Sequence, residues 1–357
     1  MRRGWRGGGV GAIAMVMVGC ARGGSAPATG AQPEPVLVEQ TSGTTALLQA
    51  VSAVNDRIVW VSGHRATWAR TTDGGATWQA GAMTGPDSAL QFRDVHAVSA
   101  DVAYLLAAGP GDRSRVYHTS DGGRTWALQF RNTDSAAFYD CFDFWDARRG
   151  VVVSDAVNGR LVIRVTTDGG ATWDRVAEAG VPPAHPGEGA FAASGTCLVT
   201  GPGGRAWIAT GAEAGARVYA SRDYGRTWTF TETPIVHGQA SGAAALAFRD
   251  ARNGLALGGR LGVARDTSNH AAVTADGGAS WSLAGRPPFA GAVYGVAWAR
   301  AGATFAAAGP GGLALTIDGG LTWRLLSVNA YWAVGYASPA AGWAVGPGGR
   351  ITRIAAL

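Results

Sequence analysis

Two aspartates in the segment "FYDCFDFWD" (138–146) are the residues whose spacing first suggests catalysis, because paired carboxyl groups can act as general acid and base. Side chains alternate between the two faces of a strand, so Asp140 and Asp143 should point to opposite sides. This alternation argues against a catalytic pair. We expect one of them to line a central channel and the other to cap a loop or to bond to Arg148 or Arg149. We keep Asp143 as a candidate binding residue.

Other residues or motifs that could support catalysis or cofactor binding are scarce. All 30 basic residues are arginine, which excludes Schiff-base catalysis and the lysine of a P-loop. The six histidines are scattered without metal-ligand spacing. Four GPG turns, at 109, 201, 309 and 346, do not continue to the G-x-G-x-x-G of dinucleotide-binding proteins. We therefore predict no catalytic residue, no cofactor and no metal site.

The charge balance gives no support for nucleic-acid binding. The formal net charge is +5 at pH 7, but removal of residues 1–19 leaves 27 arginines against 25 acidic residues. A charge of about +2 on a chain of this length creates no strong long-range field.

The N-terminus has the features of a secretory signal over residues 1–19. Arg2, Arg3 and Arg6 precede a short apolar run, "VGAIAMVMV" (10–18), which is too short to cross a bilayer. The segment "MVGC" resembles the lipobox of bacterial lipoproteins, which implies acylation at Cys20; ordinary secretion is the alternative. Residues 20–35 have the composition of a flexible tether. We expect export and anchoring to the extracytoplasmic face of a bacterial membrane, in the periplasm or at the cell surface.

An octapeptide recurs six times, beginning with "TTDGGATW" at 71–78. Its aspartates are separated by 48, 47, 55, 53 and 42 residues, a period typical of propeller blades. An aspartate can brace a turn, and the tryptophan can fill space between strands. Because Tyr224 replaces the first glycine of the fourth copy, we expect only the second glycine position to need a left-handed conformation. The structural pairs are Asp73 and Trp78, Asp121 and Trp126, Asp168 and Trp173, Asp223 and Trp228, Asp276 and Trp281, and Asp318 and Trp323.

All six copies match the pattern S/T-x-D-x-G-x-T/S-W and resemble the Asp box, or bacterial neuraminidase repeat. That resemblance implies a propeller but little about activity, since the box occurs in sialidases, other glycosidases, receptors and non-enzymatic propellers. The Arg-Ile-Pro signature of sialidases is absent. The segment "GWAVGPGGRI" (342–351) is similar to the photosystem II stability/assembly factor family, whose members are seven-bladed propellers implicated in assembling membrane protein complexes.

The repeats predict an all-β chain with one domain at 36–357, a seven-bladed propeller of four-stranded antiparallel blades. Residues 330–357 supply only three strands of the last blade. The segment "VLVEQ" (36–40) can supply the fourth, so that the N-terminal strand closes the ring and removes exposed edges.

Two long connections offer candidate binding residues on the face opposite the octapeptides. Residues 177–189 link a fourth strand to the next first strand, and residues 259–272 link a second strand to a third. Enlarged loops often bind partners, although they are equally common as tolerated insertions. The candidates are His185, Glu188, Arg260, Asp266 and His270.

Cys141 and Cys197 fall on the first strands of neighbouring blades. In an exported protein they could form a disulfide, or they could remain two buried thiols; the sequence leaves both open.

The sequence favours a non-catalytic scaffold that binds a membrane or exported protein partner, and we expect a monomer. The alternative is a sialidase-like glycoside hydrolase acting on extracytoplasmic glycans. Carboxyl groups 5 to 10 Å apart in a cleft would favour the hydrolase.

Overall fold

The computed structural model describes residues 7–9 and 34–355, and the architecture below belongs to residues 34–355. Most of the 1–19 signal, the lipidation site at Cys20 and most of the 20–35 tether fall outside the described residues, and these remain predictions. Among the residues described, no helix has the length and apolar character needed to cross a bilayer.

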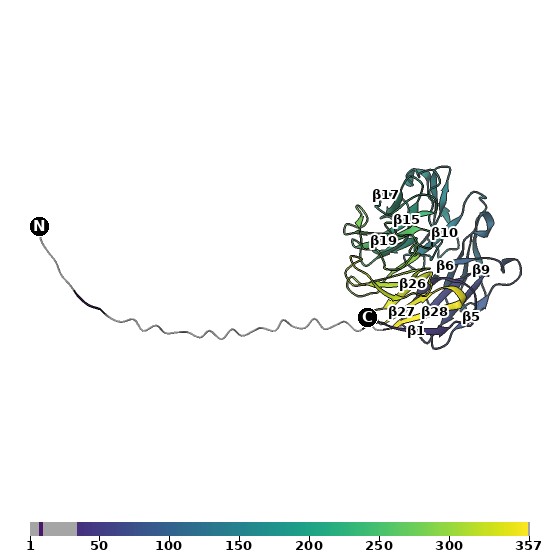
Figure 1. Cartoon of the computed structure of the whole chain (residues 1–357). Helices are drawn as coiled ribbons and strands as arrows, with labels where there is room; N and C mark the ends of the chain where they lie inside the picture. Colours follow the sequence, from purple (N-terminus) through teal and green to yellow (C-terminus); the bar gives the residue numbers. More distant parts are fainter. Residues whose placement is uncertain (1–6, 10–33, 356–357) are drawn as a thin grey trace. The chain divides into compact units, whose positions relative to one another are not determined.

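Seven antiparallel sheets of four strands each form the blades of a propeller, as the sequence predicts (Figure 1). The first three blades contain β2 (Leu48–Ala53), β3 (Val59–Gly63), β4 (Thr67–Thr71) and β5 (Gln79–Ala82); β6 (Phe92–Ala97), β7 (Ala103–Ala107), β8 (Arg115–Thr119) and β9 (Ala127–Arg131); and β10 (Tyr139–Phe144), β11 (Gly150–Val157), β12 (Arg160–Thr166) and β13 (Asp174–Arg175).

The next three blades contain β14 (Leu198–Gly201), β15 (Arg205–Gly211), β16 (Ala216–Ser221) and β17 (Thr229–Glu232); β18 (Ser241–Phe248), β19 (Gly254–Arg260), β20 (Ala271–Thr274) and β21 (Ser282–Leu283); and β22 (Gly295–Trp298), β23 (Phe305–Gly309), β24 (Gly312–Thr316) and β25 (Arg324–Ser327). Short 3₁₀ turns occur at η1 (Gly85–Asp87), η2 (Gly111–Arg113), η3 (Glu178–Gly180), η4 (Pro202–Gly204) and η5 (Pro347–Gly349).

The seventh blade joins the two ends of the chain. It contains β26 (Ala333–Ser338), β27 (Ala341–Val345) and β28 (Arg350–Ala355), with β1 (Val36–Thr41) as its outermost strand. Residues 36–41 of β1 pair antiparallel with residues 355–350 of β28. Figure 1 shows the purple β1 beside the yellow end of the chain. The predicted closure by the N-terminal strand is therefore confirmed.

Tryptophans fill the space between neighbouring blades. Trp60 on β3 is fully buried, and its ring lies 5.6 Å from that of Trp68 on β4. Trp126, which ends the octapeptide of the second blade, packs edge-on against Trp60 of the first, with ring centroids 6.1 Å apart. Edge-to-face aromatic pairs add to the hydrophobic stabilisation of buried rings. The repeated tryptophan thus joins its own blade to the preceding one.

Each octapeptide forms the turn between the third and fourth strands of its blade. In the fourth copy, Asp223 accepts hydrogen bonds from the hydroxyl groups of Ser221 and Thr227 and from the backbone N–H of Thr227. The other five aspartates accept the equivalent bonds, for example from both groups of Thr172 to Asp168. These bonds hold the pKa of the Asp168 carboxyl at about 2, below its usual range.

One detail of the turn differs from the sequence expectation. Both central positions have positive φ: 77° and 89° at Gly74 and Gly75, and 60° and 76° at Tyr224 and Gly225. The prediction that only the second position is left-handed was wrong. A non-glycine residue pays a modest steric cost in this region, which the hydrogen bonds to Asp223 and the packing of the Tyr224 ring against Trp145 offset.

Removal of one turn aspartate should destabilise the propeller. We expect Asp223→Ala to lower the free energy of unfolding by about 1–2 kcal/mol, because the N–H of Thr227 and the hydroxyl of Ser221 lose an ionised acceptor. Urea denaturation of the purified chain would measure the change. Asp174→Ala, at an exposed position on β13, is the matched control. An equal decrease in the free energy of unfolding in the two variants would contradict a stabilising role for the turn aspartate.

Candidate functional site

Two enlarged connections lie on the face of the ring opposite the octapeptide turns. Residues 176–197 join β13 to β14, and residues 261–270 join β19 to β20. Because adjacent strands are antiparallel, links from second to third strands and from fourth to first strands share one end of the blades. The octapeptide turns occupy the other end, so the predicted placement of both loops is confirmed. We call the end that carries the two loops the insertion face.

Three of the candidate binding residues brace these loops internally. Glu188 is 1% exposed and accepts hydrogen bonds from Thr210 and Arg217 at 2.7 and 3.1 Å. Asp266 accepts the backbone N–H of Arg260 and contacts Nε2 of His270 at 2.8 Å, and both Asp266 and His270 are buried. The structure thus places Glu188, Asp266 and His270 where they fix loop shape.

The remaining loop candidates are more accessible. His185 is partly exposed, and its Nε2 lies 3.4 Å from a carboxylate oxygen of Glu232. Arg260 ends β19 with an exposed side chain. Glu188 also accepts the backbone N–H of His185, which fixes the position of the histidine. Direct partner contact by His185 and Arg260 remains a prediction.

Asp143 faces the channel at the octapeptide end. It contacts Nδ1 of His96 at 2.9 Å and accepts both the N–H and the hydroxyl of Thr200. Burial alone would raise the pKa of Asp143, but the bonds from His96 and Thr200 hold it below the usual value. With Asp94 and His96 of β6, Asp143 lines a cavity of about 480 Å³.

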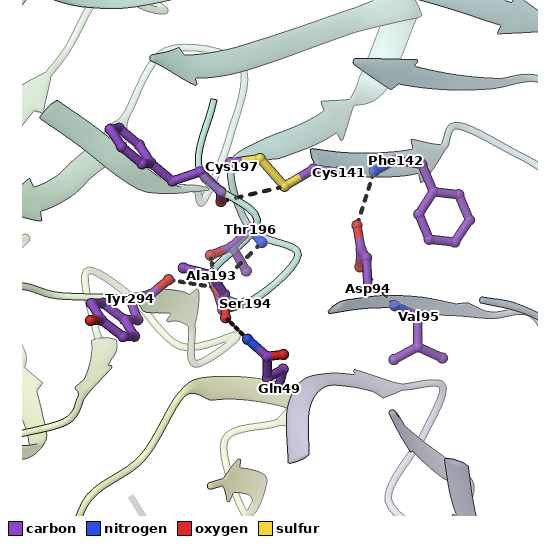
Figure 2. The surroundings of a disulfide bond; sticks show 11 residues. Gln49, Asp94, Val95, Cys141, Phe142, Ala193, Ser194, Thr196, Cys197 and Tyr294 are labelled. Carbon is purple, nitrogen blue, oxygen red and sulfur yellow. Dashed lines mark hydrogen bonds between the residues drawn. A yellow bond between two sulfur atoms is a disulfide. The ribbon is translucent and has the colours of Figure 1, made fainter. Parts of the chain in front are cut away.

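A short segment closes the channel between its two ends. Residues 190–196 precede β14 and contact several other blades. The carbonyl oxygen of Ala193 accepts a hydrogen bond from Nε2 of Gln49, and the carbonyl oxygen of Thr196 accepts one from the backbone N–H of Leu246. The hydroxyl of Ser194 donates to the carbonyl of Tyr294, as Figure 2 shows. Contacts to blades on opposite sides of the ring place this plug on the channel axis.

Two features hold the plug in place. Cys141 on β10 is joined to Cys197 by a disulfide bond, so the structure contains the bonded form of the two alternatives (Figure 2). Gly195 has φ of +80°, and a Cβ added there would overlap the carboxylate of Asp94. The plug therefore depends on a glycine at its closest approach and on a covalent bond at its end.

On the insertion face, the plug forms the floor of a second cavity, of about 470 Å³. Four polar residues in its wall occupy β-bulges: Gln49 on β2, Arg93 on β6, Asp140 on β10 and Asp155 on β11. A bulge inserts an extra residue and re-aims its side chain, and bulges are frequent beside functional sites. This site, which we call the insertion-face cavity, is thus built by the same irregularity in three neighbouring blades.

The bulge at Asp140 also corrects the prediction made from strand alternation. Asp140 and Asp143 both face the channel, on opposite sides of the plug, because the bulge interrupts the two-residue period. Within residues 34–355, neither forms an ion pair with Arg148 or Arg149, and Arg149 pairs instead with Asp146.

The insertion-face cavity is lined by two acids, Asp140 and Asp155, which occupy neighbouring bulges of β10 and β11. Burial raises the pKa of Asp140 well above its usual value, and the neighbouring Asp155 raises it further. Burial also raises the pKa of Asp155 to about 6. Two neighbouring buried carboxyl groups cannot both be ionised at low cost, so one proton remains on the pair.

The raised pKa of Asp155 predicts a pH-dependent stability. The folded protein binds this proton more tightly than the unfolded chain, so the stabilisation is complete below about pH 4 and is lost as the pH rises through about 6. We expect Asp155→Asn to reduce the loss of unfolding free energy between pH 4 and 7 by about 2 kcal/mol. Urea denaturation at each pH would measure it. Parallel pH profiles of variant and wild type would contradict the raised pKa of Asp155.

Sequence reasoning missed Gln49, Arg93 and Asp155 as site residues. The one available signal was an acid within an apolar strand, Asp155 in "VVVSDAV" (151–157). Within the described part of the chain, no group of three or more metal-ligating side chains occurs.

A scan against protein-family models found no matching family, and a search of curated proteins found no relative. Solved structures match over most of the chain. "YCF48 bound to D1 peptide" is 18% identical with a TM-score of 0.63, covering 90% of this chain and 97% of that chain. YCF48 from Cyanidioschyzon merolae is 16% identical with a TM-score of 0.64, covering 89% and 98%.

A GH74 xyloglucanase from Xanthomonas campestris is 15% identical with a TM-score of 0.60; the match covers 88% of this chain and 53% of that enzyme. These similarities show a shared propeller fold. At such identities they carry no further conclusion about activity.

Proposed function

We propose that this protein is a non-catalytic propeller that binds a protein partner on its insertion face and acts as an assembly scaffold. The observation that carries this proposal is the insertion-face cavity, in which bulged residues of three blades converge above a closed channel. A closed floor suits the docking of a surface segment, since it leaves no path through the ring.

The structural similarity to YCF48 supports the proposal that the partner is a protein. One YCF48 structure contains a D1 peptide, and this chain matches it over nearly its whole length. The six octapeptides resemble Asp boxes, and the segment at 342–351 resembles photosystem II assembly factors. These resemblances support the proposed assembly-factor-like role.

Export and lipid anchoring at Cys20 complete the proposal. A lipid on Cys20 followed by a tether over residues 20–35 would hold the propeller near a membrane surface. Mass spectrometry of the mature protein should find an acylated N-terminal cysteine, and Cys20→Ala should release the protein from the membrane fraction. An unmodified mature N-terminus would overturn the anchor.

Cross-linking affinity purification from native membranes tests partner binding. We expect wild type to recover a near-stoichiometric partner. Val263→Arg with Arg265→Glu changes two exposed residues of the insertion face and should reduce recovery by at least about tenfold. Leu321→Arg with Arg124→Glu, at exposed positions of octapeptide turns, is the matched control and should retain the partner. Loss only in the control, or no partner with any form, would overturn the proposal.

A glycoside hydrolase is the second candidate, favoured by the fold similarity to the GH74 enzyme and by the acid pair in the cavity. The geometry fits it less well. Glycosidase carboxyl groups lie on either side of the bond that is cleaved, about 5–5.5 Å apart in retaining enzymes and about 6.5–9.5 Å apart in inverting ones, whereas Asp140 and Asp155 occupy neighbouring bulges of adjacent strands in one wall of the cavity. Reducing-sugar release from xyloglucan, lost in Asp140→Asn with Asp155→Asn, would establish the hydrolase.

A further inference from the structure

We propose that the insertion-face cavity accepts a cationic side chain, a guanidinium or ammonium group, carried by the protein partner. This inference rests on the proposed partner-binding function and names the chemistry of the group that enters the cavity.

An unpaired acceptor lines the cavity. Gln49 is 4% exposed and donates its Nε2 hydrogen to the carbonyl of Ala193. Its Oε1 has no hydrogen-bond partner among the described residues. A buried acceptor without a donor costs free energy, so this position favours a ligand that supplies N–H or O–H groups. A basic side chain supplies several donors.

The carboxyl pair selects for positive charge. Asp140 and Asp155 line the same cavity wall, and the charge of Asp155 helps to raise the pKa of Asp140, so a bound cation can replace the proton that Asp140 retains. Within residues 34–355, no arginine lies within ion-pair distance of either carboxyl group. Arg93 is nearby, but its Nε and Nη2 both donate to Oε1 of Gln91. The pair therefore keeps acceptor capacity for an incoming group.

Aromatic rings complete the wall of the cavity. Phe138, Phe191, Tyr294 and Trp332 line it, and each is partly exposed. The rings of Tyr294 and Trp332 lie 5.2 Å apart at 76° to each other. Aromatic faces attract cations, most strongly where water is partly excluded. Partly exposed rings beside carboxyl groups suit a guanidinium better than an anion.

The charges of the ionisable groups around the cavity are such that one additional positive charge can be neutralised there. Arg93 on β6 is cationic, and with one proton shared by Asp140 and Asp155 it balances the pair. Burial and the nearby Arg93 lower the pKa of His64, so this histidine is neutral at pH 7. Loss of the shared proton gives the cavity a net negative charge, which the entering cation neutralises.

Binding of small probes tests the chemistry directly. N-acetyl-arginine amide should bind the full mature chain with a dissociation constant of about 1 mM or lower in NMR titration, and the neutral N-acetyl-citrulline amide at least about tenfold more weakly. Asp140→Asn with Asp155→Asn should weaken the arginine probe by about tenfold or more. Trp332→Leu should weaken it by a smaller factor through loss of the ring. Asp94→Asn, a buried acid on the other side of the plug, should leave binding unchanged.

Three results would overturn the inference: equal binding of the two probes, binding unchanged in both the acid-pair and Trp332→Leu variants, or no saturable binding up to about 50 mM. Repeating the partner purification with the acid-pair variant separates this inference from the proposed function. Loss of the partner supports the inference. Equal recovery overturns it and leaves partner binding intact. Failure of every form to recover a partner overturns the proposed function itself, and with it a partner-borne cation.

Discussion

A chain that begins at Gly43 and lacks β1 should unfold at a much lower urea concentration than a chain that begins at Glu34. Strand β1 supplies a six-residue ladder to β28, and Leu37 packs in the cluster between the sixth and seventh blades. Gln40 also bonds to the turn of the first blade, through Gly74 and Trp78. Loss of these interactions should cost about 5 kcal/mol, a large share of the stability of a typical domain.

The same truncation should make the protein associate. Without β1, the strand β28 presents unpaired backbone groups at an open edge, and exposed edges pair with other chains. Light scattering of the two chains at equal concentration would detect dimers or larger species of the shorter form. Equal unfolding midpoints and equal masses would show that the ring does not depend on its N-terminal strand.

Loss of the disulfide is the second large expected effect. The bond between Cys141 and Cys197 closes a loop with a sequence separation of 56 residues. In the chain-entropy account, such a cross-link stabilises a protein by about 4 kcal/mol. We expect Cys141→Ala with Cys197→Ala to lose most of this amount in urea denaturation. Alanine fits two fully buried sites without adding a polar group.

Thiol titration supplies the control for the disulfide. The unfolded wild-type chain that begins at Glu34 contains only Cys141 and Cys197 and should show no free thiol until a reductant is added. The reductant should lower the unfolding midpoint of wild type and leave that of the double alanine variant unchanged. Two reactive thiols in the untreated chain would contradict the bonded structure.

The blades and their closure were predictable because they repeat. Six octapeptides in register mark the turn between third and fourth strands, and "VLVEQ" (36–40) fits the vacancy left by residues 330–357. The placement of the two long loops followed from strand order alone. The repeat period and the order of the strands can be read from the sequence, so the blades and loops can be predicted without knowledge of side-chain positions.

The site was harder to predict because it depends on departures from that periodicity. Bulges at Gln49, Arg93 and Asp140 turn these residues toward the channel, and nothing in the local sequence marks a bulge. Asp155 occupies a bulge beside that of Asp140 on the next strand, a proximity that spacing along the chain does not reveal. Glu188 and Asp266 were chosen as charged loop residues, but the structure buries both in hydrogen bonds that shape the loops.

The plug could not be predicted from the sequence either. Residues 190–196, "AFAASGT", carry no charge and no motif, yet they separate the channel into two cavities. Their position depends on contacts to several other blades, which exist only after the ring has closed.

Site-specific photo-cross-linking in cells tests the central claim most directly. A photoreactive residue is placed either at Val263 on the insertion face or at Leu321 on the octapeptide face, both exposed positions. Partner binding through the insertion face predicts a discrete adduct from position 263 and none from position 321. An adduct from position 321 alone, or from neither position, would contradict the scaffold account.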